Sequence, residues 1–282
     1  MVIGVLRNPP ELTTTELIGP GTVALVVEYD GSAFHGWQNQ KGKVRSVDGV
    51  LRDAVSAVAN AGVDTVCAGR TDAGVHASYQ VVHFDSPVCR PLRSWVLGIN
   101  SNLPRDVRVQ WAGRMEPGFS ARFSALSRRY RYVMLSSPTP PAILRDHVSW
   151  THHSLDVECM DEAAQLLLGE HDFSAFRAAG CQSNTPWREV QAIQVTREGP
   201  YAVLDIEANA FLHHMVRNIA GSLMRVGQGE ANPRWIGELL EGGDRRAAGI
   251  TAPAQGLYLV DVKYPASMGL PEALPGPSFL AG

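Results

Sequence analysis

Apolar positions along the chain follow two spacings: alternation, as in strands, and recurrence every three or four residues, as in helices. In the first half, helical spacing covers residues 46–59 and 92–99, and Ser46 stands where a side chain can cap the first helix. Strand-like runs cover residues 22–29, 63–67, 80–84 and 107–113. The first half is therefore predicted to run β-α-β-β-α-β.

The second half is predicted to repeat this order of elements, although no repeat is visible in the sequence itself. Helical spacing covers residues 155–168, 211–226 and 233–240, and strand-like runs cover 128–135, 190–196, 201–209 and 257–264. A β-α-β-β-α-β unit is the ferredoxin-like arrangement. We expect an α/β (α+β) protein of two ferredoxin-like subdomains, residues 22–125 and 126–282, whose sheets meet around a central cleft. Residues 1–21 are expected to form a flexible N-terminal extension.

Composition narrows the class of protein. With 45% hydrophobic and 19% charged residues among 282, the chain has the composition of a globular protein with ample material for a core. No apolar run reaches the length of about 18 residues that suggests a membrane span, and the N-terminus lacks the pattern of a signal peptide. The four cysteines form no C-x-x-C pair, so a zinc finger is not expected. We therefore expect a cytoplasmic protein.

The kind of basic residue modifies what the net charge suggests. A net charge of -3 argues mildly against a nucleic-acid binder, but only three of the 25 basic residues are lysines. Codon bias can explain this excess of arginine. The functional explanation is that arginine offers a planar fork for phosphate and a face that stacks on bases.

A polar loop between two predicted strands carries the strongest candidate chemistry. Gly69 and Gly74 bracket Arg70, Thr71 and Asp72, and His76 follows two residues later. The plain interpretation of Asp72 is a loop carboxylate that caps its own backbone. The glycines, the histidine and Arg70, which can pair with Asp72 and keep it ionised, favour a functional one. Hydrolysis of a glycosidic bond normally uses two carboxylates, whereas this loop offers one, which suits a reaction whose leaving group departs as a stabilised anion and is not lost to water. A pyrimidine base that leaves a ribose fits this description, but one carboxylate alone does not select it.

Two further segments are candidates for binding. Arg128, Tyr130 and Tyr132 alternate on one face of a predicted strand, as suits phosphate contact with base stacking, although an edge strand guarded by arginine would look the same. On the helix predicted at 211–226, the pair His213-His214 reads most simply as partly buried histidines. Arg217 lies among apolar residues, where a buried guanidinium needs a carboxylate partner, and Asp72 is a candidate.

The motifs together resemble the bacterial tRNA pseudouridine synthase A family. They are Glu28-Tyr-Asp-Gly-Ser32 with Gly36-Trp-Gln38, Gly69-Arg-Thr-Asp-Ala-Gly-Val-His76, Ala121-Arg-Phe-Ser124 with Arg128-Arg-Tyr-Arg-Tyr132, and the segment 211–218. The resemblance implies a two-subdomain enzyme, usually a homodimer, that needs no metal or organic cofactor. It implies isomerisation of uridine to pseudouridine at positions 38, 39 and 40 of the tRNA anticodon stem-loop.

The resemblance also implies roles for four residues by their positions in the motifs. Asp72 matches the catalytic aspartate, and Arg70 is its neighbour in the active site. Tyr130 matches the tyrosine that stacks on the target uracil, and Arg217 matches the arginine that pairs with the aspartate.

Two other functions stay open at this point. Paired ferredoxin-like units could form an RNA-binding protein without catalysis, for which Asp72 would be dispensable. A metal-dependent hydrolase could use His76, His213 and His214 as ligands.

Overall fold

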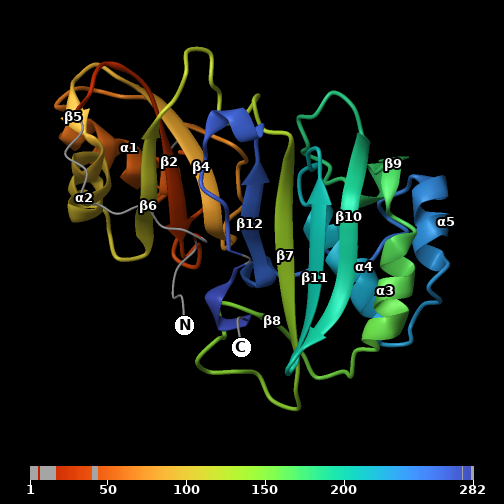
Figure 1. Cartoon of the computed structure of the whole chain (residues 1–282). Coiled ribbons are helices and arrows are strands. Elements are labelled where there is room, and N and C mark those ends of the chain that lie inside the picture. The colour runs from red at the N-terminus through yellow and green to blue at the C-terminus, as the bar shows by residue number, and fades with distance from the viewer. Residues whose placement is uncertain (1–5, 7–16, 40–43, 275, 281–282) are drawn as a thin grey trace. The chain divides into compact units, whose positions relative to one another are not determined.

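A computed structural model describes residues 6, 17–39, 44–274 and 276–280 of the chain (Figure 1). Its residues group into two compact units. Unit 1 holds the chain up to Leu126 together with Tyr258 onward, and unit 2 holds Ser127–Leu257. No helix among the described residues is long and apolar enough to cross a membrane.

Unit 1 is a sheet with two helices. Its strands are β2 (Gly21–Tyr29), β3 (Val66–Cys67), β4 (His76–Ser86), β6 (Val107–Arg114) and β12 (Leu257–Lys263). Strand β2 pairs antiparallel with β6 and with β4. Strand β4 also pairs antiparallel with β3 and parallel with β12, so β4 contacts most of the sheet.

The helices of unit 1 pack through the apolar stripes that the sequence predicted. They are α1 (Val47–Ala59) and α2 (Leu92–Asn102). Leu51 and Val55 of α1 and Trp95 and Ile99 of α2 are all fully buried. Ser46 caps α1 as predicted, because its hydroxyl accepts a hydrogen bond from the backbone N–H of Gly49 at 3.2 Å.

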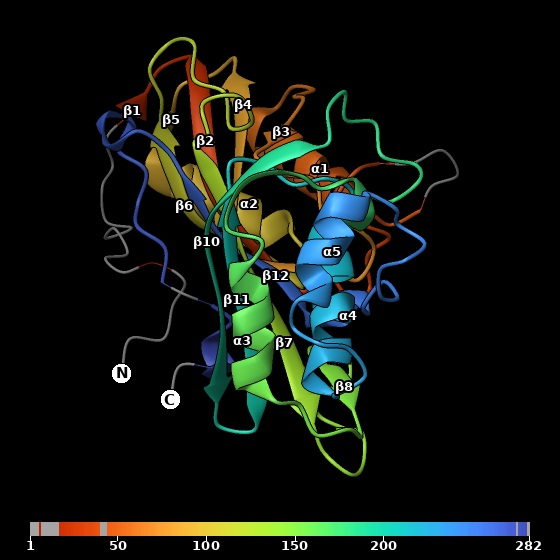
Figure 2. The same ribbon diagram turned by 90° about the vertical axis from the view of Figure 1, so that its right-hand side faces the viewer.

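Unit 2 is an antiparallel sheet in the order β7-β11-β10-β9, with β8 parallel to β7. The strands are β7 (Ser127–Ser136), β8 (Ser149–Thr151), β9 (Gly169–Asp172), β10 (Trp187–Glu198) and β11 (Tyr201–Ala208). Helices α3 (Val157–Gln165), α4 (Met215–Gly227) and α5 (Trp235–Gly242) lie together against this sheet (Figure 2). Their buried side chains include Met160, Ile219, Leu223 and Ile236.

The predicted mixed α/β class is confirmed, and several boundaries differ from the prediction. The helix expected from residue 211 begins only at Met215, because His214 takes a left-handed conformation with φ of 61°. Strands β8 and β9 were missed because they are short and carry little apolar alternation. The ferredoxin-like arrangement, the cleft and the subdomain boundary at residues 125 and 126 stay predictions.

The predicted flexible extension, residues 1–21, lies mostly outside the described residues. Within its described part, β1 (Leu17–Ile18) pairs antiparallel with β5 (Arg90–Pro91) of the same unit. Leu6 forms an isolated bridge to Ala273. These contacts attach the described positions of the extension to unit 1.

Candidate active site

The Asp72 loop, residues 68–75, joins β3 to β4 in unit 1 as the sequence predicted. Its backbone forms a turn in which the N–H of Val75 donates to the carbonyl of Asp72 at 3.1 Å. The Asp72 side chain is half-buried, whereas its neighbour Thr71 is buried. The loop therefore presents one partly exposed carboxylate on a folded turn.

The side chain of Gln80, which is fully buried on β4, holds the start of this loop. Its amide donates to the carbonyl of Gly69 at 2.6 Å, and its carbonyl oxygen accepts from the N–H of Gly69 at 3.3 Å. Further along the loop, the hydroxyl groups of Thr71 and Tyr29 lie 2.7 Å apart in a buried hydrogen bond. Gln80 was not among the predicted site residues, although a polar residue inside an apolar strand was a signal for such a contact.

A second loop, residues 30–39, packs its backbone directly on the Asp72 loop. The N–H of Trp37 donates to the carbonyl of Thr71 at 2.9 Å, and that of Gly74 donates to Phe34 at 3.3 Å. Gly36 has φ of 95°, and a Cβ there would lie 3.2 Å from the carbonyl carbon of Asp72. Only glycine combines this conformation with so close an approach, so Gly36 is needed for the loop 30–39 to pack against the backbone of residues 71–73.

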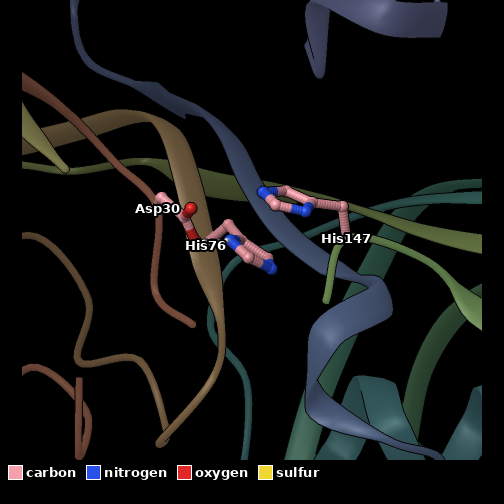
Figure 3. A group of neighbouring side chains, drawn as sticks. All are labelled: Asp30, His76 and His147. Atoms are coloured by element: carbon pink, nitrogen blue, oxygen red, sulfur yellow. Dashed lines mark ion pairs between the residues drawn. The ribbon is translucent and has the colours of Figure 1, made fainter. Parts of the chain in front are cut away.

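His76 ties the beginning of β4 to the turn after β2 (Figure 3). Its buried Nδ1 atom lies 3.0 Å from the backbone nitrogen of Gly31 and 3.2 Å from a carboxylate oxygen of Asp30. One nitrogen cannot accept from Gly31 and donate to Asp30 at once, so Nδ1 accepts the first bond when it carries no proton and donates the second when it does. The hydrogen bond with His76 holds the pKa of the Asp30 carboxyl well below its ordinary value, and Ser32 acts in the same direction. The His76 ring also stacks on the ring of Tyr258, at 4.7 Å between centroids.

Arg70 is exposed at the edge of the same loop. Its charge acts on two groups near β3. Burial raises the pKa of the half-buried Asp48 carboxyl, and the charge of Arg70 works against that increase. Burial also raises the pKa of the buried Cys67 thiol, and the charge of Arg70 again opposes the increase. The predicted pairing of Arg70 with Asp72 stays a prediction.

His83 on β4 holds a second segment of unit 1. Its Nδ1 atom accepts from the backbone N–H of Ala121 at 3.0 Å, and its ring meets the edge of Phe119. Burial lowers the pKa of His83 below the ordinary value of 6.5, while Asp85 opposes this shift. Protonation at Nδ1 would remove the acceptor that Ala121 requires.

The stability of the protein is expected to depend on pH through His83. Because the pKa of His83 is lower in the folded chain than in the unfolded chain, the unfolded chain binds the proton more readily. The His83 contribution is thus complete above about pH 6.5 and is lost as the pH falls toward the folded-state pKa. Urea unfolding at pH 7.5 and 5.5 should show a larger loss for the wild type than for His83→Gln, which keeps an acceptor but cannot titrate. Equal losses would contradict this role.

Tyr130 and Arg217, the two other predicted site residues, lie in unit 2. Tyr130 is 8% exposed on β7, and its ring meets Phe211 edge to face at 5.0 Å between centroids. Arg217 is half-buried on α4, and its Nε atom donates to the carbonyl of Ala252 at 2.8 Å. A backbone carbonyl thus satisfies one of its donors, and the predicted pairing with Asp72 stays a prediction.

Two of the arginines on β7, the strand that carries Tyr130, form ion pairs within unit 2. Arg129 and Arg131 both form ion pairs with Asp205 of β11, at 2.6 Å and 2.8 Å. They project from the face of β7 opposite to Tyr130, as the alternation predicted. These two arginines of β7 therefore share one carboxylate.

The histidine pair lies just before α4 and not on its face. The rings of His213 and His214 lie 4.0 Å apart between centroids, and the backbone N–H of His213 donates to the sulfur of Cys181 at 3.4 Å. His214 occupies the N-cap position. Both histidines were predicted to lie on the helix at 211–226, which is wrong because the helix begins after them.

Comparisons with known proteins agree with the motifs. A family model described as tRNA pseudouridine synthase matches residues 25–124 and 163–265. A tRNA pseudouridine synthase A of Aeromonas hydrophila is 57% identical over 258 residues, which are 92% of this chain and 96% of the relative. Another, of Pseudomonas aeruginosa, is 52% identical over 97% of this chain and 96% of its own length. A chain from the crystal structure of a Cbf5-Nop10-Gar1 complex covers 84% of this chain and 57% of its own, at 11% identity and a TM-score of 0.31, too low for any structural conclusion.

The chain belongs to the tRNA pseudouridine synthase family. The predicted family is confirmed, and so is the predicted class of enzyme, an isomerase that converts uridine in tRNA to pseudouridine. The matched segments contain Arg70, Asp72 and Arg217, whereas Tyr130 lies between them.

Proposed function

We propose that this enzyme forms pseudouridine at positions 38, 39 and 40 of the tRNA anticodon stem-loop, with Asp72 as its catalytic carboxylate. The observation that carries the proposal is the construction of the Asp72 loop within the segment that matches the family. Gln80 and the loop 30–39 fix the backbone around Asp72, and its side chain remains partly exposed. A catalytic group needs this combination of fixed position and access.

The proposed reaction begins with a uridine that leaves the stacked stem. Flipping a nucleotide out of a helix costs roughly a few kcal/mol. Stacking of the uracil on the ring of Tyr130 offsets part of this cost, at about 1–3 kcal/mol per base. Arg70 or Arg217 keeps Asp72 ionised by supplying a positive charge beside it.

Two routes from this complex conserve atoms and electrons. In the first, the Asp72 carboxylate attacks C1′ of the ribose and the C1′–N1 bond breaks, so the uracil leaves as an anion. In the second, Asp72 removes the proton from C2′, and the uracil again leaves with the electrons of the C1′–N1 bond. In the first route the base then turns, and C5 bonds to C1′ as the ester bond between C1′ and Asp72 breaks. In the second route C5 bonds to C1′ of the resulting glycal while Asp72 returns its proton to C2′. In both routes the C5 proton then passes to water, and N1 takes up a proton. Deuterium at C2′ slows only the second route, so a kinetic isotope effect on single turnover separates them.

The proposed reaction uses neither a metal ion nor an organic cofactor, because every step is a proton transfer or an exchange of carbon–nitrogen, carbon–oxygen or carbon–carbon bonds. A chelator should leave turnover unchanged, whereas a hydrolase that uses His76, His213 and His214 would lose its activity. We also propose that the enzyme acts in the cytoplasm as a homodimer. Light scattering at several concentrations tests the dimer directly.

The proposed target positions can be tested with matched tRNA transcripts. One transcript carries uridine at positions 38, 39 and 40, and three others replace one of these uridines by cytidine. Chemical mapping after reaction should show pseudouridine only where uridine remains at these positions. Modification elsewhere at a similar rate would contradict the proposed specificity but not the reaction.

Gly36→Ala is expected to lower kcat by about tenfold, because its contacts require the backbone beside Asp72 to move by a few tenths of an ångström, and an error of about 1 Å in the position of a catalytic group costs about 100-fold. The added methyl group would lie 3.0 Å from the carbonyl oxygen of Thr71 and would displace the backbone beside Asp72. Gly229→Ala is the matched control, since φ there is also positive, at 74°, but no atom lies within 4 Å of the added Cβ. Steady-state kinetics measure kcat for both variants. An unchanged kcat for Gly36→Ala would refute the role of this contact.

A further inference from the structure

Phe123 is an aromatic side chain that unit 1 leaves in solvent, with 80% of its surface exposed. It lies in the turn Ser120–Ser124, between β6 and β7. Because this ring stays in solvent, it adds little hydrophobic stabilisation to the fold. The reaction proposed at Asp72 does not use this side chain.

The turn that presents Phe123 is held firmly. The N–H of Ser120 donates to the hydroxyl of Ser124 at 3.0 Å, and the N–H of Ser124 returns to the carbonyl of Ser120 at 2.9 Å. The hydroxyl of Ser120 accepts from the N–H of Phe123 at 3.3 Å. The backbone that carries the ring is therefore fixed before any partner arrives, which lowers the entropic cost of binding.

The same turn is anchored to the core of unit 1 through Ala121, which is completely buried. Its N–H donates to His83 of β4 at 3.0 Å, and its carbonyl accepts from the hydroxyl of Tyr264 at 2.6 Å. Strand β4 thus holds both this turn, through His83, and the Asp72 loop, through Gln80.

Positive charge accompanies the exposed ring. The guanidinium carbon of Arg122 lies 5.2 Å from the centre of the Phe123 ring. The charges of Arg122 and Arg70 both act on the buried Cys67 thiol, where they oppose the rise in its pKa that burial causes.

We propose that Phe123, with Arg122 beside it, is a stacking platform for an unpaired base of the tRNA. An aromatic ring beside arginine suits single-stranded RNA, because the ring takes the face of a base and the guanidinium takes a phosphate. A paired base in a stem has both faces covered, so the platform selects a nucleotide of the loop or one displaced from the stem. This assignment rests on the proposed function, since it takes tRNA as the partner.

The test compares two replacements of Phe123 that differ only in whether a ring remains. Phe123→Leu should raise both the Kd and the KM for a tRNA transcript by about tenfold, the range expected for one lost stacking contact, with kcat within about twofold. Phe123→Tyr should keep the wild-type values within about twofold. Leu97→Ala, which shortens an exposed apolar side chain of α2, serves as the control and should change none of them.

A second variant tests the phosphate contact independently of the ring. Arg122→Gln should reduce the slope of log Kd against log salt concentration by about one unit. Melting temperature and mass in solution are measured for every variant. The proposal requires that both stay at the wild-type value in Phe123→Leu.

Three results would overturn the proposal. The first is that Phe123→Leu binds tRNA and reacts like the wild type. The second is that Phe123→Leu and Phe123→Tyr weaken tRNA binding equally. The third is that Phe123→Leu changes the mass in solution without changing RNA affinity, which would assign the ring to a protein interface. Pseudouridine formation by the wild type is measured in the same preparations. If the wild type modifies tRNA and Phe123→Leu matches it, only the platform fails. If the wild type binds tRNA without modifying it, the proposed function fails, and the binding data still decide on the platform.

Discussion

Asp72→Asn is expected to lower pseudouridine formation by more than about 10⁴-fold, because it removes the group that acts as nucleophile or base. Asparagine has nearly the same shape as aspartate but no negative charge. The bonds of the loop to Gln80 and Trp37 use backbone atoms of Gly69 and Thr71, so the substitution leaves them in place. Binding of tRNA should therefore remain within about threefold of the wild type. Single-turnover kinetics with enzyme in excess measure the effect.

Asp53→Asn is the matched control for this prediction. Asp53 is an exposed carboxylate on α1 of the same unit, and its substitution removes the same charge away from the loop. We expect its turnover to equal that of the wild type. An Asp72→Asn enzyme that retains more than about a tenth of wild-type turnover would remove Asp72 from its proposed role.

Tyr130→Leu is expected to reduce kcat/KM by about 5- to 150-fold, which corresponds to the stacking energy of about 1–3 kcal/mol for one base. Tyr130→Phe keeps the ring and should stay much closer to the wild type. The ring is almost buried and meets Phe211 edge to face, so the leucine variant also loses an aromatic contact within unit 2.

Stability measurements separate the two effects of this substitution. A weakened contact with Phe211 lowers the melting temperature, whereas a lost contact with uracil lowers kcat/KM at temperatures where the variant is fully folded. Assays are therefore run well below the melting temperature of Tyr130→Leu. Equal kinetics for the leucine and phenylalanine variants would refute stacking by Tyr130.

Local signals in the sequence were enough to predict most of the elements. The apolar run in β2 and the stripe of Leu51 and Val55 in α1 produced the right type of structure, because each buries a continuous apolar face. The cap at Ser46 depends only on the next three residues and was also predicted correctly. The Asp72 loop was located because glycines and polar residues interrupt two strand-like runs.

Contacts between distant segments were beyond local signals. The bond between Gln80 and Gly69 and the approach of Gly36 to Asp72 depend on how β4 and the loop 30–39 pack. The start of α4 was misplaced because the apolar spacing continues through residues 211–214, whereas the backbone at His214 is left-handed. The pairing of Arg129 and Arg131 with Asp205 depends on the register of β7 and β11, which no pattern within either strand contains.

The most direct test of the central claim is release of tritium from tRNA labelled at C5 of uridine. Formation of a C5–C1′ bond displaces the hydrogen at C5 into water, whereas binding alone or hydrolysis of the tRNA leaves it on the base. The wild-type enzyme should release tritium in an amount equal to the pseudouridine formed, and Asp72→Asn should release none above background. Wild-type protein that binds the labelled tRNA and releases no tritium would contradict the claim, as would equal release by Asp72→Asn.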